Sequence, residues 1–231
     1  MASLNEPPGT YTFEAALTNS STATSCSGAV SCSGTYSVTY YGSSISANTT
    51  STYVGKSVSL TATASPSVPS NFNLGIYSFS NSTIFKSSTS TPLSATITQT
   101  KATSIEYAAW LYNGSASSPT IGNHSSQEPI ITWSNYSVSV TSGTNINNVL
   151  CYSNDQITAT ASPQFPSGYY LDLYDVTNST MLCSTTSTSC SATAYIVGPT
   201  NFEACISTSS TSLSNTAGCS SLSIPGCLET V

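Results

Sequence analysis

The feature that most constrains this chain is an internal repeat whose two copies lie 97 residues apart. Residues 60–66 read Leu-Thr-Ala-Thr-Ala-Ser-Pro, and residues 157–163 read Ile-Thr-Ala-Thr-Ala-Ser-Pro. The triplet Asn-Ser-Thr at 81–83 returns at 178–180 with the same offset and without a gap. A repeat that stays in register predicts that the chain contains two copies of one folding unit.

A partial third copy lies near the N-terminus. Residues 13–16 read Phe-Glu-Ala-Ala and resemble Phe-Glu-Ala-Cys at 202–205. In both places a stretch rich in Ser and Thr follows and leads to two closely spaced cysteines. We therefore expect residues 1–34 to form the terminal hairpin of a preceding module, or a strand pair used in assembly. The two full copies are expected at 35–134 and 135–231.

Alternation of apolar and polar residues indicates β-strands in both copies. One face of the strand expected over residues 57–64 carries Val58, Leu60, Ala62 and Ala64. Pro, Gly and Asn-Ser pairs separate such runs, and no run of useful length has the period of a helix. Several short strands in a unit of roughly 100 residues favour an all-β fold of tandem immunoglobulin-like antiparallel β-sandwiches.

The chain is poor in charge, since only 5% of its residues are charged and Lys and Arg together number three. A nucleic-acid interface needs clustered basic side chains to neutralise phosphates, so we expect no nucleic-acid partner. No run approaches the roughly 18 apolar residues that cross a bilayer, so we expect no membrane span. No residue pattern indicates a cofactor, and we expect none.

The cysteines indicate disulfides rather than metal ligands. There are eight of them, with a single histidine and no zinc-type spacing. Disulfides persist in oxidising surroundings, which predicts an extracellular or cell-surface protein. Cys183 and Cys190 occur only in the second copy, and residues gained together suggest bonding partners. The expected bonds join Cys183 to Cys190, Cys151 to Cys205, Cys26 to Cys32, and Cys219 to Cys227.

Two runs carry a resemblance to a known family. Residues 54–64 read Val-Gly-Lys-Ser-Val-Ser-Leu-Thr-Ala-Thr-Ala, and residues 169–175 read Tyr-Tyr-Leu-Asp-Leu-Tyr-Asp. Both resemble bacterial Ig-like repeats that occur in tandem on large secreted and cell-surface proteins. Those repeats often end near a tryptophan, as the first copy does at Trp133. The resemblance implies a spacer, adhesive or accessory role, and its motif is structural rather than functional.

The residues that could serve catalysis do not form a convincing set. His124 is the only imidazole, and it lies in a polar loop that has no counterpart in the second copy. A lone histidine in such a loop is usually solvated. Glu14, Glu106 and Glu203 recur at one place in all three copies, which indicates a shared structural or surface role. We therefore predict that the protein is not an enzyme.

Three aspartates could contribute oxygen ligands to a calcium ion. They are Asp155, Asp172 and Asp175. Calcium takes clustered carboxylate oxygens, but the spacing of these residues matches no known calcium loop. Alternation sets Asp172 on the face opposite its apolar neighbours. We expect solvated strand carboxylates and no metal site.

The expected binding surface is aromatic, because exposed Tyr and Trp stack on sugars or pack against another protein. The alternative is that these side chains cover sheet faces, where Tyr is favoured. The main candidates are Trp110, Trp133, Tyr170 and Tyr174, with Tyr40, Tyr41, Tyr77 and Tyr112 as further outward positions. Acceptor sequences for N-glycosylation begin at Asn19, Asn48, Asn81, Asn113, Asn123, Asn135 and Asn178. Chance yields a similar number in a chain so rich in Ser and Thr.

Together these features predict a non-enzymatic extracellular structural protein, namely a surface stalk, an adhesin segment or a filament subunit. The expected partners are further copies of the chain, added head to tail by strand addition, or surface glycans. The alternative is a carbohydrate-binding accessory module of a secreted hydrolase. The two readings differ in whether the chain is retained on an insoluble polysaccharide.

Overall fold

The computed structural model describes residues 7–17, 29, 31–115, 118–213 and 216–228. Over these residues the regular structure consists of strands, and no helix is long and apolar enough to cross a membrane. The chain divides into two compact units. The first comprises residues 1–48, 59–96 and 105–130, and the second comprises 49–58, 97–104 and 131–231.

The first repeat copy forms two sheets. One has the order β10-β7-β5 and contains β5 (Gly42–Ala47), β7 (Ser57–Ser65) and β10 (Leu93–Thr98). The other has the order β6-β13-β11-β8-β9, with β12 paired to β11. Its strands are β6 (Ser51–Tyr53), β8 (Asn73–Ser78), β9 (Thr83–Ser88), β11 (Thr103–Ser115), β12 (Ser118–His124) and β13 (Ile130–Ser134). The pairs β5–β7, β8–β9, β8–β11 and β11–β12 are antiparallel, and β6 runs parallel to β13.

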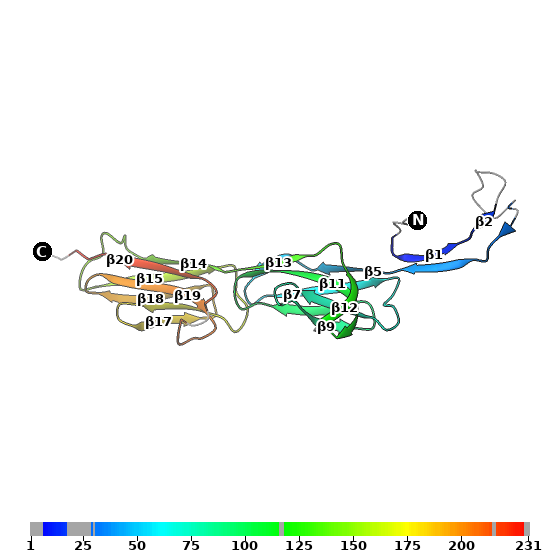
Figure 1. Cartoon of the computed structure of the whole chain (residues 1–231). Coiled ribbons are helices and arrows are strands. Elements are labelled where there is room, and N and C mark those ends of the chain that lie inside the picture. The colour runs from blue at the N-terminus through cyan, green and yellow to red at the C-terminus, as the bar shows by residue number, and fades with distance from the viewer. Residues whose placement is uncertain (1–6, 18–28, 30, 116–117, 214–215, 229–231) are drawn as a thin grey trace. The chain divides into compact units, whose positions relative to one another are not determined.

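The second copy also forms two sheets (Figure 1). Buried residues from both of these sheets belong to one core. The first sheet has the order β14-β15-β18, with β14 (Ser137–Ser142), β15 (Ser153–Ser162) and β18 (Ser189–Ile196). The second has the order β17-β16-β19-β20, with β16 (Tyr170–Asp175), β17 (Thr180–Thr185), β19 (Thr200–Ser207) and β20 (Cys219–Ile224). Three strands facing four is the arrangement of an immunoglobulin-like sandwich.

The buried residues follow the alternation seen in the sequence. Along β7 the side chains of Val58, Leu60, Ala62 and Ala64 are buried, while the residues between them are exposed or half-buried. In β15 the same pattern recurs with Ile157 and its alternate neighbours. Because a strand presents successive side chains to opposite faces, the polar positions face outward and the apolar ones form the core. The predicted all-β fold of immunoglobulin-like antiparallel sandwiches is confirmed.

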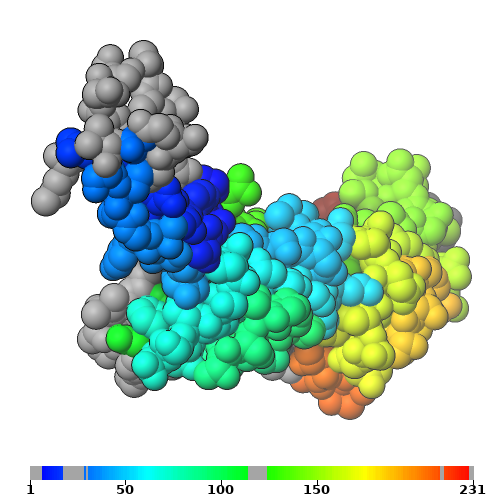
Figure 2. All heavy atoms as spheres, turned by 90° about the vertical axis from the view of Figure 1, so that its right-hand side faces the viewer, coloured from blue at the N-terminus to red at the C-terminus, as the bar shows by residue number. Residues whose placement is uncertain are grey.

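A two-stranded ribbon precedes the first sandwich. It pairs β1 (Gly9–Phe13) with β4 (Tyr36–Tyr40), and a short pair, β2 (Ala16–Leu17) with β3 (Ser31–Cys32), extends it. Both pairings are antiparallel. Figure 2 shows these strands in blue, standing out from the cyan residues of the same unit.

The ribbon is amphipathic. Tyr11 lies opposite Val38 and Phe13 lies opposite Tyr36, which places their side chains together on one face. The other face is polar and includes a hydroxyl contact between Thr10 and Thr39 at 3.0 Å. A face of this kind normally packs against another sheet.

Candidate functional site

A group of contacts in the second unit joins residues 53–55 to Tyr136, which directly precedes β14. The hydroxyl of Tyr136 donates a hydrogen bond to the carbonyl oxygen of Val54 at 2.8 Å. The ring of Tyr53 stacks on that of Tyr136, with centroids 5.2 Å apart. Val54 is fully buried and belongs to the core of the second sandwich. We call Tyr53, Val54, Gly55, Tyr136 and Tyr169 the tyrosine junction.

Burial raises the pKa of two hydroxyl groups of the junction. Desolvation raises the pKa of Tyr136 to about 12, and repulsion from the neighbouring hydroxyls of Tyr169 and Tyr53 adds to the rise. Desolvation also raises the pKa of Tyr169. Ionisation would place a charge where water cannot solvate it, so both groups hold their protons more firmly than free tyrosine does.

Gly55 is required by the geometry of the junction. Its φ of +80° lies in the left-handed region, which side chains rarely adopt. A Cβ at this position would lie 2.6 Å from the Cε2 atom of Tyr169 and 3.0 Å from Pro166. Glycine therefore lets the backbone approach the aromatic ring directly.

Trp133 is a buried residue and not a binding platform. Its side chain is buried, and its indole N–H donates to the carbonyl oxygen of Lys56 at 3.1 Å. The expectation that Trp133 contributes to an aromatic binding surface is therefore wrong. In β13 the side chain of Trp133 lies on the same face as that of the buried Ile131.

Trp110 lies in a half-buried aromatic cluster on the sheet that contains β8 and β11. Its ring is 4.9 Å from that of Tyr77 and 5.6 Å from that of His124, and Phe79 packs edge-on against Tyr77. The rings are inclined by 51° to 87°, so they do not form the flat platform on which a sugar stacks most readily. The indole N–H of Trp110 is buried and has no hydrogen-bond partner among the described residues. Sequence reasoning missed Phe79, which directly follows β8.

The other aromatic candidates are dispersed. Tyr170 and Tyr174 are half-buried on β16, two positions to either side of Asp172. Tyr40 is half-buried in the ribbon and contacts Tyr11, and Tyr41 is exposed. Tyr112, by contrast, is 2% exposed, so the expectation of an outward position is wrong for that residue. In the described structure, Trp110 is the tryptophan that remains a candidate for binding.

The expectation of solvated aspartates is also wrong, because all three are buried. Asp155 accepts hydrogen bonds from the hydroxyl of Ser142 at 2.5 Å and the backbone N–H of Thr144 at 3.2 Å. Asp175 accepts two from Asn178, at 3.0 Å from the backbone and 2.8 Å from the side chain. These carboxylates satisfy turn donors, which is a structural use of the charge.

Asp172 occupies the most enclosed position of the three. One of its oxygens accepts a hydrogen bond from the hydroxyl of Ser207. The other has no hydrogen-bond partner in the part of the chain that is described. Alternation sets Asp172 opposite the core residues Leu171 and Leu173, yet its side chain is buried. The Ser207 hydroxyl that it contacts also accepts a hydrogen bond from the backbone N–H of Ser209 at 3.3 Å.

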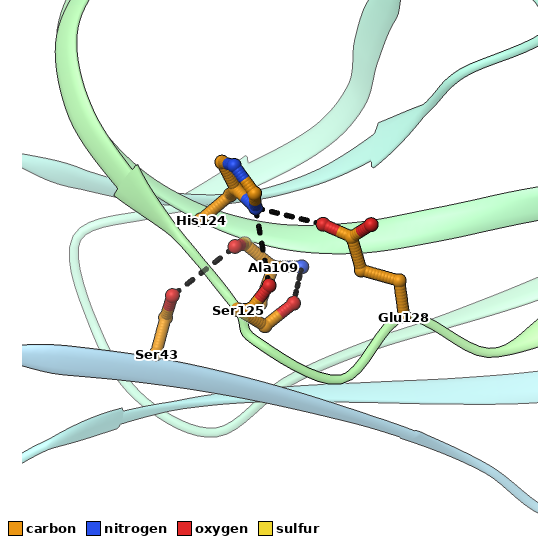
Figure 3. Close-up of polar contacts among 5 residues, drawn as sticks. All are labelled: Ser43, Ala109, His124, Ser125 and Glu128. Carbon is orange, nitrogen blue, oxygen red and sulfur yellow. Dashed lines mark hydrogen bonds and ion pairs between the residues drawn. The ribbon is translucent and has the colours of Figure 1, made fainter.

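His124 pairs with an acid rather than with a nucleophile (Figure 3). Its Nδ1 atom lies 2.7 Å from Glu128 Oε1 and 3.1 Å from the carbonyl oxygen of Ser125. The Ser125 hydroxyl points elsewhere and accepts a hydrogen bond from the backbone N–H of Ala109 at 3.1 Å. The hydroxyl of Ser43 donates to the Ala109 carbonyl oxygen at 3.1 Å. This group of contacts holds the segment after β12 against β11 and β5.

None of the three recurring glutamates is fully buried. Glu106 in β11 and Glu203 in β19 are half-buried, and Glu14 at the end of β1 is exposed. The Glu203 carboxylate lies within 4.8 Å of the sulfurs of Cys205 and Cys219. Because those sulfurs form a disulfide, they are not the thiolates that a metal ion would need.

The structure confirms one of the expected disulfides and corrects two. Cys183 is bonded to Cys190, across the β17 and β18 strands. Cys205 is bonded to Cys219 rather than to Cys151, because the two residues lie directly opposite each other in β19 and β20.

The remaining cysteines are also in disulfides where the structure describes them. Cys151 bonds to Cys227, next to a backbone hydrogen bond from the Cys151 N–H to the Leu228 carbonyl oxygen at 2.9 Å. The expected bond between Cys219 and Cys227 is therefore wrong. Cys32 is in a disulfide, and Cys26, its expected partner, lies outside the described residues.

The glycosylation acceptors differ in access. Asn113 is half-buried, while nothing is described of the Asn19 position or of the Asn123 side chain. The exposed acceptors are Asn48, Asn81, Asn135 and Asn178. Asn178 uses its side-chain N–H in the hydrogen bond to Asp175, so a glycan there would compete with that contact.

Comparison with known proteins shows no matching family model and no matching curated protein. Among solved structures, the chain is similar to the fibronectin(III)-like modules of Clostridium thermocellum CbhA, with 15% identity and a TM-score of 0.30. That match covers 80% of this chain and 94% of the other. A marsupial T cell receptor matches with 13% identity and a TM-score of 0.31, covering 72% of this chain and 67% of the receptor chain. The fold assignment rests on the strand order described above.

Proposed function

We propose that the chain is a non-enzymatic structural protein of the cell exterior, which acts as a surface stalk, an adhesin segment or a filament subunit. It would consist of two immunoglobulin-like modules, 35–134 and 135–231, preceded by a hairpin over 1–34. The observation that carries the proposal is the tyrosine junction. A structural element needs its segments held firmly, and within the second compact unit the junction holds the segment that follows β6 by a buried hydrogen bond, an aromatic stack and a close glycine contact.

The disulfides support a location outside the cytoplasm. Three are described in the second copy, and no described cysteine is free. Reducing compartments keep cysteine thiols reduced, so disulfides do not persist there. A chain with three described disulfides therefore suits an oxidising compartment.

Immunogold labelling of intact cells of the source organism tests this location. We expect label on the outer surface or on structures that extend from it. Label confined to the cytoplasm would overturn the proposal.

The ribbon supports assembly by strand addition. It consists of two strands, and in the described structure the outer edges of β1 and β4 carry no further strand. Unpaired edges are sites at which another chain can add a strand. We propose that copies of the chain join head to tail through this ribbon.

A second candidate function is a carbohydrate-binding accessory module of a secreted hydrolase. The observation on which it depends is the Trp110 cluster, which gathers aromatic rings at a half-buried site although they form no flat platform. Retention of the full chain on insoluble cellulose or chitin, lost in Trp110→Ala and kept in Tyr174→Ala, would support this function. A wild-type chain that stays in the supernatant would exclude it for those polymers.

A further inference from the structure

We propose that the end of the second sandwich at which β18 finishes is the acceptor for the ribbon of a second copy. Five exposed apolar residues define this end, which we call the apolar pole: Leu150, Tyr152, Tyr195, Val197 and Leu228. The inference rests on the proposed head-to-tail assembly and names the surface that receives the ribbon.

The pole is a contiguous feature. Leu150 and Leu228 form a β-bridge, and the backbone N–H of Tyr152 donates to the Ile196 carbonyl oxygen at 2.7 Å, beside Val197. The five side chains are between 45% and 69% exposed. None of them is charged. Grouped exposure of large apolar side chains indicates an interaction surface.

The tyrosine junction shows which side chains pack against the residues of the first copy that correspond to the pole. Leu150 and Tyr152 lie 97 residues after Tyr53 and Gly55. In the tyrosine junction, Tyr53 is stacked on Tyr136, and Gly55 faces the ring of Tyr169. The equivalent position in the second copy is exposed. We therefore expect the pole to accept aromatic side chains.

A hollow beside the pole offers room for them. It has a volume of about 280 Å³ and is bordered by Ile146, Asn147, Pro225, Gly226, Cys227 and Leu228. The lining residues are uncharged, so an aromatic ring could enter without leaving a charge unsolvated. An anchor side chain in a pocket is the usual centre of a protein interface.

The ribbon supplies aromatic side chains on one face. Tyr11, Phe13 and Tyr36 lie there with Val38, and Tyr36 is 72% exposed. In the comparable strand pair β19 and β20, the core-facing Phe202 is fully buried beneath the opposite sheet. The ribbon therefore has an apolar face of the kind that packs against another surface. This face carries no charged residue, and neither does the apolar pole.

A second copy is the occupant that fits both surfaces. Each copy carries one ribbon and one pole, and the two surfaces differ, so the contact is heterologous. A heterologous contact that does not close into a ring generates an open chain. Two poles meeting each other would instead give a closed dimer.

Two variants of the full chain test the proposal by complementation. Tyr152→Ser with Leu228→Ser removes the pole and keeps the ribbon. Tyr36→Ser with Val38→Thr removes the ribbon face and keeps the pole. Ile130→Thr, at an exposed apolar position on β13, is the matched control. Far-UV circular dichroism and non-reducing gels establish that each variant is folded and fully disulfide-bonded.

Sedimentation velocity over a wide concentration range gives the readout. We expect the wild type and the control to form species larger than dimers, and each double variant to associate at least about tenfold more weakly. An equimolar mixture of the two variants retains one ribbon and one pole, so it should form a one-to-one dimer that does not grow. A ribbon variant that still dimerises, or a mixture that stays monomeric, would overturn the proposal.

A monomeric wild-type chain would also overturn it. That result would leave the proposed location outside the cytoplasm standing, because immunogold labelling tests the location separately.

Discussion

At the scale of single residues, Tyr136 combines a side-chain hydrogen bond with two ring contacts. It donates a hydrogen bond to Val54, stacks on Tyr53 and packs edge-on against Phe165. Its hydroxyl is buried, so the hydrogen bond has no competition from water. Loss of that one oxygen leaves a buried carbonyl without its partner.

The substitution Tyr136→Phe tests this contribution. It keeps the ring and removes the donor, so we expect the free energy of unfolding to fall by about 1–3 kcal/mol. Urea denaturation of the full chain gives the value, with Tyr170→Phe, at a half-buried position, as the control. Equal effects in both variants would contradict the assigned role.

The raised pKa of Tyr136 predicts alkaline sensitivity. The folded pKa of about 12 exceeds the ordinary value of 10, so the folded chain holds the proton more tightly than the unfolded chain does. The resulting stabilisation is complete below pH 10 and is lost as the pH rises through about 12. Between these values the urea midpoint of the wild type should fall more steeply than that of Tyr136→Phe. Parallel curves would show that the hydroxyl does not titrate in this way.

At the scale of elements, the disulfides of the second copy enclose loops of very different length. Cys151 and Cys227 are 76 residues apart in sequence, whereas Cys183 and Cys190 are 7 apart. A bond that closes a longer loop removes more freedom from the unfolded chain. The longer bond should therefore contribute more to stability.

Paired serine substitutions measure that difference. We expect Cys151→Ser with Cys227→Ser to lower the free energy of unfolding by about 2 kcal/mol more than Cys183→Ser with Cys190→Ser. Urea denaturation at neutral pH, with each variant checked for its remaining bonds, provides the comparison. A larger loss from the shorter bond would show that strain or packing outweighs loop length.

At the scale of the whole molecule, the sequence predicts the strands better than it predicts what lies between them. The alternation along β7 and β15 is local, so Leu60 and Ile157 could be assigned to the core from their neighbours alone. The bond between Cys205 and Cys219 depends on strand register, which the repeat offset does not reveal.

Burial by loops and by opposite sheets is equally hard to foresee. Asp172 is buried although alternation sets it opposite the core residues of β16, and Trp133 is enclosed by the sandwich. Neither position has a local sequence signal, because the covering groups are distant in the chain. The candidate site was accordingly predicted in part: Trp110 remains, whereas the tyrosine junction emerged only from the structure.

The proposed structural role requires a second sandwich that its disulfides cross-link. Single-molecule pulling of the full chain from its two ends, with and without reductant, tests it most directly. With disulfides intact, the second sandwich should release little length, because the 76-residue separation between Cys151 and Cys227 is bridged. Reductant should lengthen that step and leave the step of the first sandwich unchanged. Extension without discrete unfolding steps, or steps that do not respond to reductant, would contradict the claim.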